Sequence, residues 1–364
     1  MKFSCSLIIA LICLLIACRC FAQTSEVPSF KLYLIGDAGE GDTTGATLHD
    51  LHTKLLADSN SAVIFLGDNC YLKTFISSLF DLEVGGFNDS KTARQRVMGQ
   101  MNILRGYKGS AYFVPGNHDW WNMINLKKGE RLLKREQVFI EDTLKTFTSL
   151  KNHNTGTFLP SDGSPGPVSL DFNKGKTRII FIDTYRLIIE EGRKRKSAAV
   201  FLNTFYNNLQ TQLKDATDKH EKIIVVAHHP IHAKGKHSGP LIFWERVIRR
   251  FGDNNPNYPP YNKMAVRLDS LLKEQHHPDI YYVSGHEHSL EYLYNDSLHY
   301  IISGAGSRID EVKAESCENG FECLKFNEEG FFEIDFFGHK ESVLMYHRKD
   351  DRSELELHCV AGCK

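Results

Sequence analysis

Five short segments of the sequence combine metal-ligand residue types with glycine or proline, and each follows a run of apolar residues. They are Gly36-Asp37-Ala38-Gly39, Gly67-Asp68-Asn69-Cys70-Tyr71, Gly116-Asn117-His118-Asp119, His228-His229-Pro230 and Gly285-His286-Glu287-His288. Carboxylate, amide, phenol and imidazole groups together are the ligands that a pair of closely spaced hard or borderline metal ions requires. A lone Asp in a Gly-Asp turn is more often a helix cap, and a lone His is more often a hydrogen-bonded surface side chain. Five such segments in one chain favour a binuclear metal site over these structural alternatives.

The apolar run before each segment predicts a strand that ends where the polar residues begin. Strands are expected at 30–35, 62–66, 111–114, 178–182, 222–227 and 280–284. Helical spacing of apolar residues predicts helices at 44–58, 91–105, 127–150, 198–214 and 264–275. Strands that alternate with helices indicate an α/β layered domain. The later runs at 290–293, 299–302, 330–336 and 342–346 predict strands without intervening helices, which we expect to extend or back the sheet in antiparallel fashion.

Composition places the chain among ordinary globular proteins. It has 364 residues, of which 41% are hydrophobic and 24% are charged, and its formal net charge is -1. This balance gives no support to a global basic surface for nucleic acid. Neither a Walker loop nor a G-x-G-x-x-G motif is present, so no nucleotide cofactor is predicted.

The order and spacing of the five segments resemble the calcineurin-like metallophosphoesterases, and within them the purple acid phosphatase branch, over about residues 30–307. The resemblance implies a layered fold in which helices flank central mixed β-sheets and the metals lie at the C-terminal ends of strands. Many members of the superfamily carry Asp-x-His in the first segment, but this chain has Asp37-Ala38-Gly39, and Tyr71 lies three residues after Asp68. In the purple branch a tyrosine at this place binds iron(III), for which a hard phenolate oxygen is better suited than for Zn²⁺. A core tyrosine at the sheet edge is the structural alternative.

By position, the resemblance implies two ligand sets that share one carboxylate. The first metal would be held by Asp37, Asp68, Tyr71 and His288, and the second by Asp68, Asn117, His228 and His286. His228 is chosen over His229 because the family ligand lies two residues before the proline. The two ions would be Fe(III) and a divalent Fe, Zn or Mn.

Further residues are implied around the substrate. His118 would face the phosphate, and His118 or His237 would protonate the leaving oxygen. Asp119 would orient His118, as a carboxylate behind an imidazole does. Asp183, at another strand end, would support the site from outside the ligand sets.

These inferences predict an acid phosphatase that hydrolyses small phosphate monoesters by attack of a metal-bound hydroxide. A phosphodiesterase of the same superfamily, acting on nucleotides, lipids or cell-wall polymers, is the alternative, because it would share the ligands and differ only at the rim of the pocket. A non-catalytic binding scaffold is the minor alternative.

The first 22 residues predict export. Lys2 precedes an apolar stretch at 7–17, and a stretch of about 11 residues suits a signal peptide but is too short for an ordinary membrane-spanning helix. Cleavage after Ala22 is favoured, and lipidation of Cys18 in the lipobox-like Leu15-Ile16-Ala17-Cys18 is the alternative. Either would give a secreted, periplasmic or lipid-anchored protein. We divide the chain into a signal at 1–22, a catalytic metallophosphoesterase domain at 23–348 and a cysteine-containing tail at 349–364.

Export changes the interpretation of the cysteines beyond the leader. Cys317 and Cys323, like Cys359 and Cys363, are close enough in sequence to bridge in an oxidising compartment, although spacing does not fix the pairing and a zinc site is the minor alternative. Cys70 is interpreted as a small buried filler, because no base adjoins it in the sequence.

Overall fold

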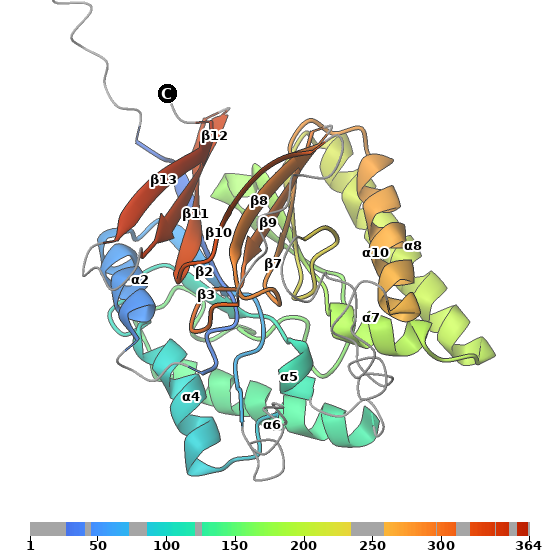
Figure 1. Ribbon diagram of the computed structural model, residues 1–364, viewed down its shortest axis with the longest axis horizontal. Coiled ribbons are helices and arrows are strands. Elements are labelled where there is room, and N and C mark those ends of the chain that lie inside the picture. The colour runs from blue at the N-terminus through green and yellow to red at the C-terminus, as the bar shows by residue number, and fades with distance from the viewer. Residues whose placement is uncertain are drawn as a thin grey trace, which may run out of the picture.

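Two mixed β-sheets lie face to face between two layers of helices (Figure 1). The computed structural model describes residues 27–40, 45–72, 86–120, 126–233, 258–295, 297–310, 321–338, 340–348 and 355–362. The predicted α/β layered fold with central mixed sheets is confirmed. The predicted leader at 1–22 lies outside the described residues.

The first sheet has six strands in the order β13-β12-β11-β1-β2-β3. They are β1 (Phe30–Ile35), β2 (Ser61–Phe65), β3 (Ser110–Phe113), β11 (Gly330–Phe337), β12 (Lys340–His347) and β13 (Glu356–Ala361). β1, β2 and β3 are parallel, whereas β11, β12 and β13 extend the sheet in antiparallel fashion. β13 was not predicted, and its pairing with β12 brings part of the segment that we separated as a tail into this sheet.

The second sheet has seven strands in the order β10-β8-β9-β7-β6-β5-β4. They are β4 (Val168–Phe172), β5 (Thr177–Phe181), β6 (Lys222–Val226), β7 (Ile280–Ser284), β8 (Leu290–Asn295), β9 (Leu298–Ser303) and β10 (Glu322–Phe326). β5, β6, β7 and β9 are parallel to one another. β4 and β10, the two edge strands, were not predicted, because their side chains are mostly half-buried and no continuous apolar run marks them.

Helices cover the outer face of each sheet (Figure 1). α2 (Ala46–Ala57), α4 (Lys91–Asn102) and α6 (Leu126–Leu144) cover the first sheet, and α7 (Thr184–Glu191), α8 (Lys196–Asp218) and α10 (Pro259–Lys273) cover the second. All five predicted helices are present with shifted ends. α10 begins earlier than predicted, since proline is favourable in the first turn of a helix. α7 was not predicted. Among the described residues, no helix has the length and apolar character needed to cross a membrane.

Coverage on both faces explains why the central strands are apolar throughout. In β1, Leu32 and Leu34 belong to the core between the sheets, whereas Tyr33 and Ile35 belong to the core beneath the helices. Successive side chains of a strand point to opposite faces, so a strand that is buried on both faces has no polar side. The polar residues are therefore left to the turns that follow the strands.

The carboxyl ends of the parallel strands of both sheets meet at one edge of the molecule. The Gly36 amide, after β1, donates to the Ser303 carbonyl at the end of β9 at 2.6 Å, and the Gly306 amide donates back to the Gly36 carbonyl at 3.1 Å. A Cβ atom at Gly36 would lie 3.1 Å from the Cα of Gly285, which follows β7. Glycine at both positions lets the two sheets approach closely here.

A buried carboxylate ties together the turns that follow β2 and β3. Asp119, in the short helix α5 (Asn117–Trp120), accepts hydrogen bonds from the backbone amides of Asn69, Cys70 and Gly116 at 2.9, 3.2 and 2.7 Å. Its Oδ2 also accepts one from Asn69 Nδ2 at 3.1 Å. One side chain thus satisfies four N–H groups that have no strand partner and fixes the two turns relative to each other.

We expect Asp119→Ala to lower the free energy of unfolding by about 3 kcal/mol, because buried N–H groups without an acceptor are costly. Chemical denaturation of the two proteins measures this difference. Asp142→Ala, on the exposed side of α6, is the control and should change stability little. An Asp119→Ala protein as stable as the control would contradict this role.

Candidate metal centre

Asp37 and Asp68, which follow β1 and β2, both lie within hydrogen-bond distance of the Tyr71 hydroxyl. This hydroxyl is 2.7 Å from Asp37 Oδ1 and 3.0 Å from Asp68 Oδ2. It is also 3.2 Å from His288 Nε2, which lies 3.6 Å from Asp37 Oδ1. The structure therefore brings together, in a buried place, the four residues predicted for the first metal.

Asn117 and two histidines gather next to Asp68. His228 Nε2 is 3.0 Å from Asn117 Oδ1 and 3.4 Å from Asp68 Oδ2. His286 Nδ1 is 3.1 Å from the same Asn117 oxygen. The four residues predicted for the second metal are thus adjacent as well, and Asp68 is the carboxylate common to both sets.

Hydrogen bonds orient two of the imidazoles. His228 Nδ1 lies 2.8 Å from the Leu66 carbonyl oxygen, so Nδ1 carries a proton and Nε2 is directed toward Asp68 and Asn117. His288 Nδ1 lies 2.8 Å from Asp310 Oδ2, which directs its Nε2 toward Asp37 and Tyr71. Metal-ligating histidines typically hold their second ring nitrogen in this way.

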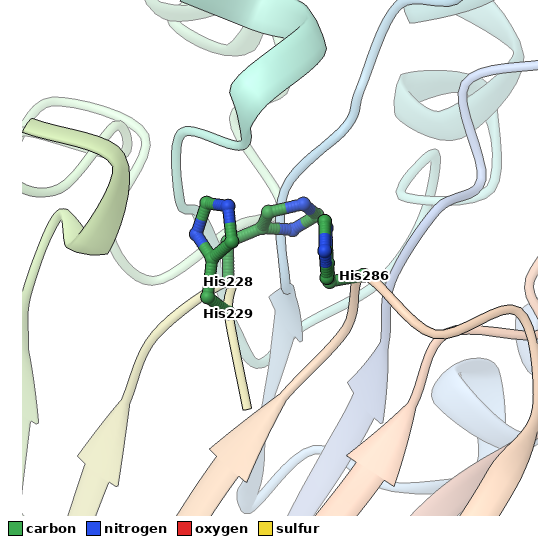
Figure 2. Close-up of side chains that lie close together, drawn as sticks. All are labelled: His228, His229 and His286. Atoms are coloured by element: carbon green, nitrogen blue, oxygen red, sulfur yellow. The ribbon is translucent and has the colours of Figure 1, made fainter. Parts of the chain in front are cut away.

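Figure 2 shows the consecutive residues His228 and His229 beside His286. Nitrogen atoms of these three side chains lie within 4.8 Å of one another, and so do ligand atoms of Asp37, Asp68 and His228. Only His228 belongs to both groups. His229 Nδ1 lies within hydrogen-bond distance, 2.9 Å, of Thr184 Oγ1. His228 is therefore the better placed of the two for the shared carboxylate.

Three of the candidate ligands have left-handed backbone conformations. The φ angles of Asp37, Asp68 and His286 are 55°, 53° and 72°. Such angles are uncommon for residues other than glycine, and residues that hold them are found disproportionately at functional sites. The turns after three different strands adopt this conformation where their side chains converge.

Burial controls the protonation of the carboxylates. It raises the pKa of Asp37 to about 6, with a further contribution from the charge of Asp68 and against the opposing charge of His228. Burial acts on Asp68 in the same direction, but attraction by His228 and His118 outweighs it and holds the pKa of Asp68 below its usual range. Burial and the two carboxylates raise the pKa of the Tyr71 hydroxyl well above its ordinary value. The protein alone therefore keeps the proton of Tyr71 and ionises Asp37 only at a higher pH than an ordinary carboxyl, because full ionisation would place three negative charges together.

The donor set fits a pair of cations. Buried carboxylates at this separation are unfavourable when ionised unless positive charge compensates them. Bound metal ions would supply that charge and displace the proton held by Tyr71. The first set is rich in hard oxygen donors, whereas the second has an amide oxygen and two imidazoles, which suit a borderline divalent ion.

His118 borders this cluster on a side that solvent reaches. Its backbone amide donates to Asp68 Oδ1 at 2.8 Å, and its ring packs against Tyr71 with centroids 4.7 Å apart. The side chain is 17% exposed, whereas that of Asp68 is 2% exposed. Burial, reinforced by the charges of His288, His228 and Arg308, lowers the pKa of His118 to about 4 although Asp68 opposes this. The imidazole is therefore neutral at neutral pH.

The other predicted site residues have different positions. The hydrogen-bond partners of Asp119 are the four N–H donors described above and the Glu136 side chain, and the imidazole of His118 is not among them. Asp119 therefore holds the turns in place and does not orient the ring of His118. Asp183 accepts hydrogen bonds from Trp120 Nε1 at 2.8 Å and from the Arg186 amide at 3.0 Å, and so connects α5 to α7. His237 lies outside the described residues.

The cysteines can be placed in part. Cys70 is free and buried, as predicted, and burial raises the pKa of its thiol well above the ordinary value. Cys323 and Cys359 are disulfide-bonded. Their predicted partners, Cys317 and Cys363, lie outside the described residues.

The sequence analysis missed the turn after β9. Asp310 in this turn contacts His288 as described, and the Ser307 hydroxyl donates to the Asp37 carbonyl at 2.6 Å. Arg308 lies with its Cζ 4.8 Å from the centre of the Tyr71 ring. The signal was present as Gly304-Ala305-Gly306 directly after an apolar run, but these glycines are not followed at once by a ligand residue type.

Comparison with known proteins agrees with this geometry. Curated protein sequences give no match. Among solved structures, the chain is similar to GAP50, the anchor in the inner membrane complex of Plasmodium, with 18% identity and a TM-score of 0.56 over 92% of this chain and 89% of that one. It is also similar to PhoD, with 9% identity and a TM-score of 0.54 over 94% of this chain and 73% of that one. These likenesses show a shared fold alone. The model of the calcineurin-like phosphoesterase family matches residues 30–290, which is most of the chain, and this protein therefore belongs to that family.

Proposed function

We propose that this protein is an exported, binuclear metal-dependent phosphatase that hydrolyses phosphate monoesters, of the purple acid phosphatase type. The observation that carries the proposal is the position of the Tyr71 hydroxyl, within 3.2 Å of Asp37, Asp68 and His288. A phenolate at this place adds a third anionic oxygen to the first ligand set, which favours a trivalent ion such as Fe(III). The second set, with Asn117, His228 and His286, would hold divalent Fe, Zn or Mn.

Two bound ions would supply the positive charge that clamps the phosphate and activates water. The chain would determine where the ions lie, because hydrogen bonds and close packing fix the strand ends that carry their ligands. It also supplies His118, whose neutral ring carries one N–H donor and stands beside the centre. We assign His118 to the departing oxygen of the ester, with His237 as a second donor.

A phosphodiesterase remains the second candidate, because the same ligands serve both reactions. A binding scaffold is the third, since GAP50, which has a similar fold, is the anchor in an inner membrane complex. The complete set of candidate ligands and their convergence support an enzyme. Export is supported by the apolar leader and by two disulfide-bonded cysteines, which an oxidising compartment permits.

Iron(III) bound to Tyr71 would give the protein a visible absorption band from phenolate-to-metal charge transfer. We expect Tyr71→Phe to abolish this band, as absorption spectra at matched metal content would measure. Tyr107→Phe removes a buried hydroxyl that bonds to Ser61 instead and should keep the band. A colourless wild-type protein that is metal-loaded and fully active would count against the purple branch.

The monoesterase and diesterase proposals differ in their preferred substrate. We expect kcat/KM to be higher for nitrophenyl phosphate than for bis(nitrophenyl) phosphate, and activity to disappear on chelation and return with added metal. The reverse preference would favour the diesterase. A metal-free protein after careful expression with iron, zinc and manganese would favour the scaffold.

His118→Asn tests the assigned hydrogen-bond donor to the leaving oxygen. We expect kcat for nitrophenyl phosphate to fall about 100-fold, the size of effect that follows loss of a hydrogen bond to charge that develops in the transition state, with metal content unchanged. His153→Asn, which alters a half-buried histidine bonded to the Leu150 carbonyl, should leave kcat unaltered. If His118→Asn were as active as the wild type, His118 would have no role in the reaction.

A further inference from the structure

Arg308 is a cationic side chain beside the candidate centre for which the proposed reaction has no role so far. Its Cζ lies 4.8 Å from the centre of the Tyr71 ring, whose hydroxyl contacts both carboxylates. His118 packs against the same ring. The Arg308 side chain is 23% exposed, so solvent and solutes can reach it.

The chain around Arg308 is held in place from several directions. The Ser307 hydroxyl donates to the Asp37 carbonyl at 2.6 Å and accepts from the Glu40 amide at 3.2 Å. The Asp310 amide donates to the His288 carbonyl at 3.0 Å. Ser307 and Asp310, which lie on either side of Arg308 in the sequence, are therefore hydrogen-bonded to the backbone of Asp37 and His288.

A carboxylate fixes the guanidinium itself. Arg308 Nε lies 2.5 Å from Glu40 Oε2, and Glu40 belongs to the turn after β1, three residues beyond Asp37. A guanidinium is planar, so a bond at Nε also sets the direction of the two terminal nitrogens. The positive charge lies close to the centre, because the guanidinium carbon is 4.8 Å from the middle of the ring of Tyr71, a candidate ligand.

A partly exposed ion pair such as Arg308–Glu40 contributes little to stability. An apolar side chain would cover the Tyr71 ring without placing a fixed positive charge next to the place where two cations would bind. A guanidinium this close to the place where two cations would bind can attract a further anion, in addition to Asp37, Asp68 and Tyr71.

A phosphate monoester supplies such an anion. Its phosphoryl group has three non-bridging oxygens and two negative charges near neutral pH, whereas a diester has two non-bridging oxygens and one charge. Two metal ions would engage two of these oxygens. A guanidinium binds phosphate oxygens through paired N–H donors and would suit the third.

We infer that Arg308 binds the phosphate group of the substrate, with Glu40 as its positioning residue, and that this contact favours monoesters over diesters. The inference rests on the proposed phosphatase function and adds to it a determinant of the substrate class. Arg308 and His118, which both lie against the Tyr71 ring, would then both contact the phosphate.

The test measures binding of inorganic phosphate to the metal-loaded protein by titration calorimetry, together with activity on nitrophenyl phosphate and bis(nitrophenyl) phosphate. In Arg308→Gln we expect the Kd for phosphate to rise about 10-fold or more, the size of effect that follows loss of a charge-assisted hydrogen bond. Metal content should not change. The monoester kcat/KM should fall by a similar factor and the diester kcat/KM by much less. Arg308→Lys keeps the charge but loses the planar fork of the guanidinium. Its Kd for phosphate should therefore lie between those of the wild type and Arg308→Gln.

Arg267→Gln is the matched control. Arg267 also stacks on a tyrosine, with its Cζ 3.9 Å from the centre of the Tyr206 ring, but it joins α10 to α8. It should leave phosphate binding unchanged.

Three results would overturn the inference: phosphate affinity of Arg308→Gln within about twofold of the wild type, equal loss of monoester and diester activity, or loss of metal from both Arg308→Gln and Arg308→Lys. A wild-type protein that binds metal and phosphate but hydrolyses neither ester would instead refute the proposed function, and the phosphate titrations would still test Arg308.

Discussion

The structure of this protein depends on the close approach of two buried carboxylates, Asp37 and Asp68. Each has a carboxylate oxygen within 3.0 Å of the Tyr71 hydroxyl, and both side chains are buried. Ionised together they would repel, and burial would make that repulsion strong. The protein without metal relieves this repulsion in part, because the pKa of Asp37 is raised and His228 lies beside Asp68. A pair of cations would relieve it more fully, which is why an arrangement that is unfavourable for a simple core is favourable for a metal centre.

The rest of the fold serves to hold these groups in place. Parallel strands from two sheets end at one edge, and glycine at Gly36 and Gly285 allows the sheets to come close enough for their turns to share hydrogen bonds. Asp119 connects the turns after β2 and β3. The cost of left-handed backbone at Asp37, Asp68 and His286 is carried by this surrounding network.

The turn after β9 adds a second layer around the first ligand set. Asp310 orients His288, Ser307 bonds to the backbone of Asp37, and Arg308 covers the Tyr71 ring. Members of a family that share metal ligands differ in substrate through such surrounding residues. A cation in this layer alters which anions the centre accepts, and it does so without touching a metal.

The sequence by itself determined which residue types end the parallel strands, because an apolar run followed by Gly-Asp, Gly-Asn-His or Gly-His-x-His is a local pattern. It also determined, through periodicity, the central strands and the five longest helices among the described residues. The edge strands β4 and β10 escaped detection, since half-buried edges need no continuous apolar run.

Only the tertiary structure decided which side chains contact one another. Asp119 bonds to the turn after β2 and not to His118, Asp310 contacts His288, and Arg308 packs on the ring of Tyr71. These contacts join residues far apart in the chain, and their directions follow from turns with unusual backbone angles and from the packing of one sheet against the other. Neither these backbone angles nor the packing of the two sheets can be inferred from the spacing of residues within a single segment.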